Sequence, residues 1–227
     1  MSGKAVLLLS GGLDSATVLY WARRRRFEIH PLFFDYGQRH LRERRAAVRL
    51  ARLNGLELRV VRIRFPWGGS SLLEAGRELP DSAPEAIGRS IPSTYVPARN
   101  LVFLAHALSG AEALGAGSIL IGANSLDYSG YPDCRPEFYR AFNRVARLGT
   151  RAGVEGRPVR VVTPLLRLSK SGIIRLGTRL GVPYQFTWSC YAGGRRPCGR
   201  CESCRLRARG FAGAGRTDPL LDDGGPD

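Results

Sequence analysis

The feature that most constrains this chain is a short apolar run followed directly by a Ser-Gly-Gly turn and a second apolar segment. Residues 5–9 read Ala-Val-Leu-Leu-Leu, which is typical of a buried parallel strand. Residues 18–22 read Val-Leu-Tyr-Trp-Ala and indicate a helix. The turn at residues 10–12 therefore joins the carboxyl end of a strand to the start of a helix. Such a junction suits phosphate, because unpaired backbone N–H groups and the positive end of the helix dipole meet there.

The residue types in the SGGLDSAT stretch suit an anion site. Gly11 and Gly12 lack Cβ, so the backbone can approach a phosphate closely. Ser10 and Ser15 add hydroxyl donors, and Asp14 has a place there if it helps to hold a metal ion with the phosphates. The spacing matches neither a Walker loop nor a GxGxxG fingerprint. The alternative interpretation is a glycine turn that binds no ligand.

Strand and helix patterns alternate along the rest of the chain. We expect strands at residues 4–9, 29–34, 56–63, 118–122 and 159–162, and helices at residues 14–25, 40–53, 99–114, 139–148 and 170–180. This alternation predicts an α/β fold, with a doubly wound, mostly parallel sheet and helices on both faces. In such sheets, ligands bind at the carboxyl ends of the strands.

Composition divides the chain into one large domain and two shorter segments. Residues 1–183 are expected to form the α/β domain, with a long loop at residues 65–97 that is rich in Pro, Gly and Ser. Residues 184–211 are expected to form a small cysteine-containing subdomain, and residues 212–227 a disordered tail. The first strand begins almost at once and no apolar run reaches about 18 residues, so we expect a cytoplasmic protein without signal peptide or membrane span.

Four of the five cysteines lie within fifteen residues of one another, at positions 190, 198, 201 and 204. In a cytoplasmic chain such clustering indicates a metal more often than disulfides. Four thiolates fit a tetrahedral structural Zn²⁺ site. A short polar segment with few apolar residues needs such a metal ion to stabilise its fold. An iron–sulfur cluster is the alternative, because C-x₂-C-x₂-C also occurs in ferredoxins. A third interpretation is a segment without metal.

The formal charge of +16 suggests a nucleic-acid partner, but the distribution of the charge weakens that interpretation. Only Lys4 and Lys170 are lysines, so arginine supplies 33 of the 35 basic residues. The arginines are scattered, and the clusters at residues 23–26 and 42–45 fall on expected helix ends or solvated faces. We therefore favour solvated faces over a polyanion-binding surface.

Candidate site residues follow the other expected strands. The segment FDYGQRH at residues 34–40 is a candidate wall for adenine and ribose through Phe34 and Tyr36, with an ordinary loop as the alternative. Arg99 falls in the first turn of a helix, against the helix dipole, which indicates an anionic partner. Lys170 also opens a helix. In an arginine-rich chain this indicates that a compact point charge is required, although a surface lysine would give the same pattern.

Six segments occur in the order that is typical of one family, and together they resemble the 7-cyano-7-deazaguanine synthases of the queuosine pathway. They are SGGLDS, FDYGQRH, STYVPARN, GANSLDYSGYPDCRPEF, TPL…LSK and SCY…PCGRCESCRLRARGF. SGGLDS alone resembles the signature of the ATP pyrophosphatases, a superfamily that cuts ATP between its α- and β-phosphates. The loop DYSGYPDCRPEF at residues 127–138 and the C-terminal cysteines make the resemblance specific, and it covers about residues 4–211.

The resemblance implies a carbon–nitrogen ligase with an adenine nucleotide alpha hydrolase-like fold that uses ATP, Mg²⁺ and a structural Zn²⁺. It would convert 7-carboxy-7-deazaguanine and ammonia to 7-cyano-7-deazaguanine and release AMP and pyrophosphate. The catalytic residues would be Asp14, Arg99 and Lys170. ATP would contact Ser10, Gly11, Gly12, Leu13, Asp14, Ser15, Ala16, Thr17, Phe34 and Tyr36. The substrate would contact Tyr95, Asn124, Asp127, Tyr128, Asp133 and Arg135, and zinc would be bound by Cys190, Cys198, Cys201 and Cys204.

Two related functions stay open from the sequence. One is adenylation of a base in intact tRNA, which the net charge favours and the lack of an RNA-binding appendage disfavours. The other is attachment of a deazapurine to a protein amine. We expect a free small heterocycle as substrate, with neither nucleic acid nor a membrane as partner, and we leave a homodimer open.

Overall fold

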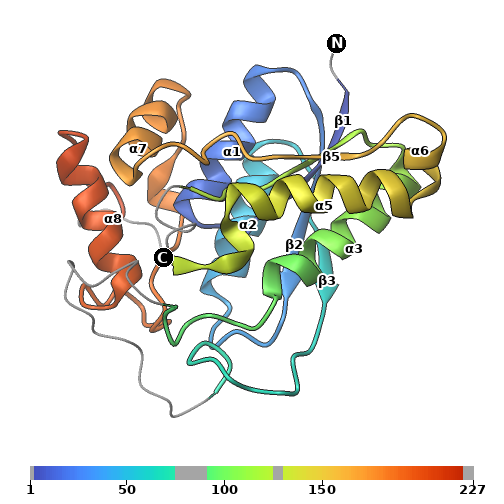
Figure 1. The fold of residues 1–227 in the computed structure, drawn as a ribbon. Helices are drawn as coiled ribbons and strands as arrows, with labels where there is room; N and C mark the ends of the chain where they lie inside the picture. Colours follow the sequence, from blue (N-terminus) through green and yellow to red (C-terminus); the bar gives the residue numbers. More distant parts are fainter. Residues whose placement is uncertain (1–2, 75–90, 125–129, 222–227) are drawn as a thin grey trace.

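A parallel sheet forms the centre of the molecule (Figure 1). The computed structural model describes residues 3–74, 91–124 and 130–221 of the chain. Within these residues the strands are β1 (Lys4–Leu8), β2 (Glu28–Asp35), β3 (Arg59–Arg62), β4 (Ser118–Leu120) and β5 (Arg160–Val162). They lie in the order β3-β2-β1-β4-β5, and all neighbours are parallel. The predicted parallel α/β fold is therefore confirmed.

Helices connect the strands and cover both faces of the sheet (Figure 1). They are α1 (Leu13–Arg24), α2 (Arg42–Leu53), α3 (Arg99–Leu114), α5 (Pro136–Gly149), α6 (Arg151–Val154), α7 (Lys170–Arg179) and α8 (Glu202–Gly213), with 3₁₀ turns at Pro132–Cys134 and Tyr184–Phe186. The sequence analysis predicts neither α6 nor α8. The buried stripe of α8 combines Cys204, Arg207, Gly210 and Phe211, so it lacks the apolar repeat that marks a helix.

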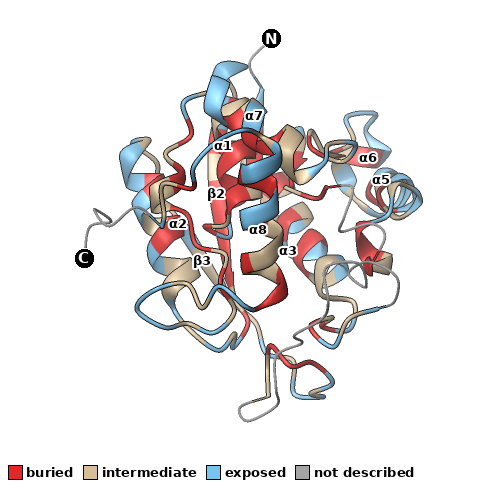
Figure 2. Cartoon of the chain, turned by 90° about the vertical axis from the view of Figure 1, so that its left-hand side faces the viewer, coloured by how far each residue is buried: buried red, intermediate tan, exposed pale blue. Residues whose placement is uncertain are grey.

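Side chains of β1 alternate between two apolar cores, one on each face of the sheet. Ala5 and Leu7 pack with residues of α1, α2 and α7, whereas Val6 and Leu8 pack with residues of α3 and α5. All four are buried, and Figure 2 shows the buried interior of the molecule in red. Burial on both faces explains why this strand reads as a continuous apolar run. It also places the turn after β1 in the middle of the carboxyl edge of the sheet.

The strand order reverses beside β1. The chain first adds β2 and β3 on one side of β1, with α1 and α2 on one face. It then crosses through α3 to the other face and adds β4 and β5 on the opposite side of β1. The loops after β1 and β4 diverge at this reversal, which is where open α/β sheets form their ligand crevice.

The C-terminal segment packs against the α/β domain. Tyr184 and Phe211 meet edge to face with ring centroids 5.5 Å apart. Arg207 of α8 donates to both carboxylate oxygens of Asp218, at 2.6 and 2.8 Å, and the two side chains are buried. Residues 212–221 therefore differ from the expected disordered tail, because α8 continues to Gly213 and the buried ion pair holds the chain beyond it.

The remaining differences from the expected elements are small. The edge strand β3 is shorter than the expected residues 56–63, because only four of its residues pair with β2. In the described parts of the loop at residues 65–97 the chain forms turns, and the amide of Ser71 donates to the carbonyl oxygen of Ser93 at 2.9 Å. Among the described residues, no helix has both the length and the apolar character that crossing a bilayer requires.

Candidate active site

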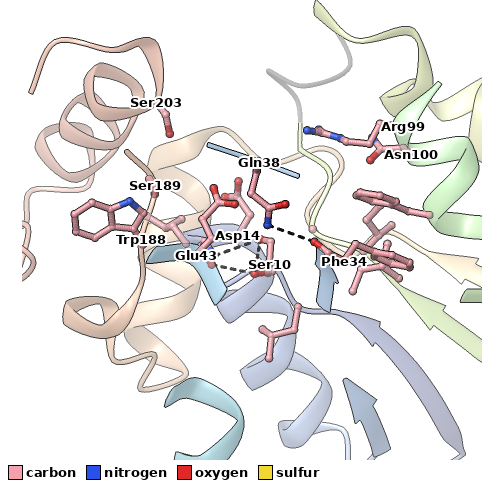
Figure 3. Close-up of a pocket in the computed structure, with 18 of the residues that line it drawn as sticks. Ser10, Asp14, Phe34, Gln38, Glu43, Arg99, Asn100, Trp188, Ser189 and Ser203 are labelled. Atoms are coloured by element: carbon pink, nitrogen blue, oxygen red, sulfur yellow. Dashed lines mark hydrogen bonds between the residues drawn. The ribbon is translucent and has the colours of Figure 1, made fainter. Parts of the chain in front are cut away.

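A cavity of about 310 Å³ opens at the carboxyl edge of the sheet, where β1, β2 and β4 end. Its walls also include the starts of α2, α3 and α7 and the segment at residues 188–191 before the cysteine-rich unit (Figure 3). The sequence-predicted residues that line it are Ser10, Gly12, Leu13, Asp14, Ser15, Phe34, Tyr36, Arg99 and Lys170. The fold thus brings the main predicted motifs to one site at the reversal of strand order.

The turn after β1 presents backbone donors to this cavity. A ring of hydrogen bonds fixes the turn: the amide of Gly12 donates to Ser10 Oγ at 3.3 Å, Ser10 Oγ donates to Ser15 Oγ, and Ser15 Oγ donates to the carbonyl oxygen of Gly12. The N-cap residue of α1 is Gly12, which has no side chain to cap the helix. The first amides of α1 have no carbonyl partner within the helix, so they are available to an anion at its positive end.

Gly11 has a different role from the expected close approach to phosphate. Its φ is +84°, and a Cβ at this position would lie 2.3 Å from the carbonyl oxygen of Glu43 and 2.7 Å from the amide nitrogen of Ala47. The absence of a side chain therefore lets the turn pack directly against the backbone of α2. Of the two glycines, Gly12 is the one that lines the cavity.

Asp14 is the centre of a hydrogen-bonded group drawn from three parts of the chain. Its Oδ2 accepts from Lys170 Nζ at 2.7 Å and from Asn124 Nδ2 at 3.2 Å. Its Oδ1 is buried and accepts no hydrogen bond from the described residues. A carboxylate oxygen without a partner, next to a turn whose amides are available to an anion, is a ligand that suits Mg²⁺. Asn124 is fully buried and positions Asp14, and its expected contact with a substrate stays a prediction.

Arg99 and three aromatic rings form a second wall of the cavity. Arg99 opens α3, and its guanidinium lies 5.6 Å from the ring centroid of Tyr36, to whose hydroxyl its Nη1 donates at 3.4 Å. Its Nε is buried and has no hydrogen-bond partner among the described residues. Phe34 stacks on Phe103 with ring centroids 4.2 Å apart. Burial raises the pKa of Tyr36, so its hydroxyl stays neutral beside the arginine.

The structure places Asp133 at the start of α3. Ala98 precedes this helix with a φ of +53° and no capping side chain. Asp133 Oδ2 accepts instead from the amide of Asn100 at 2.9 Å, and Asn100 Nδ2 donates to Cys134 Sγ at 3.1 Å. Asp133 is buried and does not line the cavity, because its carboxylate serves as the helix cap. Its expected contact with a substrate stays a prediction.

Several other predicted residues lie away from the cavity. The Tyr95 hydroxyl accepts from the amide of Ala98 at 3.0 Å and so supports the same turn, while Arg135 is exposed at the start of α5. Ala16 and Thr17 are fully buried in the core. The Thr17 hydroxyl donates to the carbonyl oxygen of Leu13 and pairs with Tyr184, so the position of these two residues does not support contact with ATP. Asp127 and Tyr128 lie outside the described residues.

Glu43 in α2 lines the cavity, although the sequence analysis did not select it. Burial raises the pKa of its carboxyl group to about 7, and the nearby Arg99 guanidinium partly opposes that rise. A signal was present in the sequence: Glu43 lies four residues before the buried Ala47, so an acid occupies the apolar face of an amphipathic helix.

The segment between α7 and α8, together with α8 itself, supplies the third wall, which the sequence analysis also missed. Trp188, Ser189 and Arg207 line the cavity from this side (Figure 3 labels the first two). The amide of Trp188 donates to the carbonyl oxygen of Gly11 at 2.9 Å, and its indole N–H donates to the carbonyl oxygen of Cys190. The cysteine-rich unit is therefore attached directly to the turn after β1.

The four clustered cysteines converge at one point. The Sγ atoms of Cys190, Cys198, Cys201 and Cys204 all lie within 4.8 Å of one another, and none is in a disulfide. Backbone amides donate to these sulfurs, including the amide of Cys198 to Cys190 Sγ at 3.3 Å. Hydrogen bonding lowers the pKa of Cys201 to about 5, whereas burial raises that of Cys190. The geometry fits a tetrahedral thiolate-bound metal ion, whose positive charge would stabilise all four thiolates together.

Comparison with known proteins places this site in a family. The model of the family described as "Queuosine biosynthesis protein QueC" matches residues 4–215. The chain belongs to the QueC family. A 7-cyano-7-deazaguanine synthase from Anaeromyxobacter dehalogenans is 56% identical over 220 residues, covering 95% of this chain and 94% of the relative. Another from Trichodesmium erythraeum is 52% identical over 221 residues, covering 96% of this chain and all of the relative.

The resemblance inferred from the six sequence segments is thereby confirmed, and the chain is an enzyme of the carbon–nitrogen ligase class.

Among solved structures, the NMN synthetase of Francisella tularensis is similar in fold, with a TM-score of 0.50. It is 14% identical in sequence, and the match covers 95% of this chain and 78% of that protein. This likeness supports the architecture alone.

Proposed function

We propose that this chain converts 7-carboxy-7-deazaguanine and ammonia to 7-cyano-7-deazaguanine with ATP as the activating substrate. Membership of the QueC family supports the substrate class. The observation that carries the mechanism is the Lys170–Asp14 pair, which stands at the mouth of the SGGLDS turn with the free amides of α1 beside it. This arrangement suits a nucleotide whose α-phosphate must be attacked.

The proposed chemistry explains why ATP is needed at all. A carboxylate does not accept ammonia, because its oxygen is a poor leaving group. Transfer of that oxygen to the α-phosphate of ATP makes it part of AMP, and pyrophosphate leaves. Ammonia then displaces AMP and gives an amide. A second adenylation, on the amide oxygen, lets that oxygen leave as AMP and produces the nitrile.

Each wall of the cavity has a place in this proposal. Ser10, Gly12 and the first amides of α1 would hold the phosphates that leave as pyrophosphate. Lys170 and Arg99 would stabilise negative charge that develops on the phosphates and on the adenylated oxygen. Asp14 Oδ1 would bind Mg²⁺, which when present neutralises phosphate charge. The rings of Phe34 and Tyr36 would pack against a planar base and hold the reacting groups in register.

We assign Zn²⁺ to the four cysteines as a structural ion. The donor set offers four sulfurs and no open coordination position, and an ion there would stabilise the segment that carries Trp188 and Arg207 to the cavity. A cytoplasmic location suits this assignment, because thiolates stay reduced there.

Mass spectrometry of the products tests the proposed function directly. Incubation of the protein with ATP, Mg²⁺, ammonium and 7-carboxy-7-deazaguanine is expected to yield the amide and then the nitrile, with one AMP released for each adenylation. Formation of ADP and free phosphate as the primary products would contradict cleavage between the α- and β-phosphates.

A competition experiment separates the free base from RNA as substrate. A tRNA-modifying enzyme would lose affinity steeply with added salt, because phosphate contacts release counterions. We expect turnover of the free base to change little between low and moderate salt, and we expect bulk tRNA not to inhibit it. Strong inhibition by tRNA would favour adenylation of a base in intact RNA instead.

A further inference from the structure

The charges around the cavity leave one acid without a partner. Among the described lining residues, the cations are Arg39, Arg99, Lys170 and Arg207, and the carboxylates are Asp14 and Glu43. Asp14 is already paired with Lys170 at 2.7 Å. Glu43 makes no side-chain hydrogen bond or ion pair with any part of the chain that the structure describes. The excess of cations in the cavity suits a polyphosphate but repels ammonium. The place in the cavity that favours ammonium is therefore beside the unpaired carboxylate.

The backbone holds Glu43 against the phosphate-binding turn. Its carbonyl oxygen occupies the space that a Cβ on Gly11 would need, so the start of α2 and the turn are in direct contact. Figure 3 shows the carboxylates of Glu43 and Asp14 turned toward the same side of the cavity. The acid therefore stands next to the place where the adenylated substrate would form, at a position set by main-chain packing.

Ammonia poses a proton problem in this reaction. At neutral pH most of it is present as ammonium, which has no lone pair and cannot attack a carbonyl carbon. An enzyme that takes ammonia from solution therefore benefits from a group that attracts the cation, accepts one proton and releases the neutral nucleophile inside the site.

We propose that Glu43 binds ammonium in the cavity and accepts the proton that it must lose before its nitrogen attacks the adenylated substrate. This inference rests on the function proposed above and identifies the subsite of its nitrogen substrate. The carboxylate of Glu43 takes one proton from ammonium and becomes a carboxylic acid. The nitrogen lone pair then forms a bond to the acyl carbon, the carbon–oxygen bond to AMP breaks, and AMP leaves with that electron pair. The new C–NH₃⁺ group gives its extra proton to solvent and becomes the amide.

The surroundings of Glu43 suit this role. The Arg99 guanidinium from α3 favours the charged form of Glu43, and Glu43 in turn raises the pKa of Tyr36, which follows β2. Lys170 from α7, Asp14 from α1 and His40 from the segment before α2 line the same cavity. Burial holds the carboxyl pKa at about 7, so both the charged acceptor and the protonated form are accessible near neutral pH.

Two nucleophiles test the proposal on the full-length protein. Hydroxylamine is largely uncharged at neutral pH and needs no deprotonation before attack, whereas ammonium does. We expect Glu43→Gln to lower the kcat/KM for ammonium at pH 7 by about 100-fold. The same variant should form the hydroxamate from hydroxylamine at close to the wild-type rate. Raising the pH should restore its use of ammonia, because free NH₃ then becomes abundant.

Isotope exchange between pyrophosphate and ATP, measured without ammonium, keeps the two proposals apart. If the wild-type protein shows no exchange that depends on 7-carboxy-7-deazaguanine, the proposed function fails. If it shows exchange and Glu43→Gln loses hydroxylamine and ammonium turnover equally, the role of Glu43 as proton acceptor is wrong. Glu137→Gln is the matched control, because Glu137 also lies in the first turn of a helix but is exposed, and it should change neither nucleophile. If Glu43→Gln fails to fold, Glu43→Asp is the variant that tests the proposal. It keeps a carboxylate but shortens the side chain by one methylene, so turnover with ammonium should fall while turnover with hydroxylamine should not.

Discussion

The amide of Trp188 donates a 2.9 Å hydrogen bond to the carbonyl oxygen of Gly11. Two residues later, Cys190 belongs to the four-sulfur cluster, and its carbonyl oxygen accepts from the Trp188 indole. The cysteine-rich unit and the turn after β1 are thus joined through one residue. A substitution in the four-sulfur cluster should therefore also alter the proposed nucleotide site.

Removal of the metal should weaken ATP binding as well as stability. Metal analysis is expected to give about one zinc per chain, and Cys204→Ser should loosen the unit, because structural zinc contributes directly to folding. The KM for ATP should rise in the variant, since Trp188 loses its support. A brown protein that contains iron and acid-labile sulfide would contradict the zinc assignment. The exposed pair Arg151–Glu155 offers a control, and Glu155→Gln should change neither property.

Asp14→Asn should lower kcat about 100-fold or more while the protein stays folded, because the variant keeps the shape but loses the charge that faces Lys170 and the phosphates. Steady-state kinetics and a thermal melt measured on the same sample would check this. A variant that loses activity only in proportion to its folded fraction would indicate that the pair is structural.

Asp218→Ala should destabilise the protein by about 3–5 kcal/mol, because it leaves Arg207 buried without its counter-charge. Urea unfolding measures the loss. For comparison, Glu28→Gln removes an exposed partner of Lys4 and should cost less than about 1 kcal/mol. Equal effects of the two substitutions would mean that the segment after α8 is not anchored in solution.

Glu43 should make the wild-type protein less stable as the pH rises. Its folded pKa of about 7 lies above its reference value of 4.5, so the folded state binds more protons between these values. The stability that this group contributes is fully present below about pH 4.5 and is lost as the pH rises through about 7. Glu43→Gln should therefore nearly match the wild type at pH 4.5 and exceed it by about 3 kcal/mol at pH 8. Parallel unfolding curves at both pH values would contradict the raised pKa.

The sequence predicted the fold, and it predicted which motifs lie together at the carboxyl edge of the sheet, because both depend on local patterns. A buried strand, a glycine turn and a helix start can be read from adjacent residues, and they place Ser10 and Asp14 where the structure has them. Arg99 could be found too, because a cation in the first turn of a helix conflicts with the dipole.

The features that the sequence did not reveal depend on contacts between distant segments. Asp133 has the chemistry to bind a base, but its oxygen caps α3 by accepting from the amide of Asn100, thirty-three positions earlier in the chain. Glu43 and Trp188 reach the cavity only through the packing of α2 and of the cysteine-rich unit on the turn at Gly11. A single sequence does not reveal which partner a polar side chain has already taken.

The alternation of β1 between two cores also limits how this enzyme can vary. In the chain, Ser10 comes directly after side chains that point alternately to opposite faces of the sheet. A one-residue insertion or deletion within residues 5–9 would send every later side chain of the strand to the wrong core. Hydrophobic packing of the strand thus determines where the turn after β1 lies. We expect that individual apolar residues of the strand can be exchanged, but that its length cannot change.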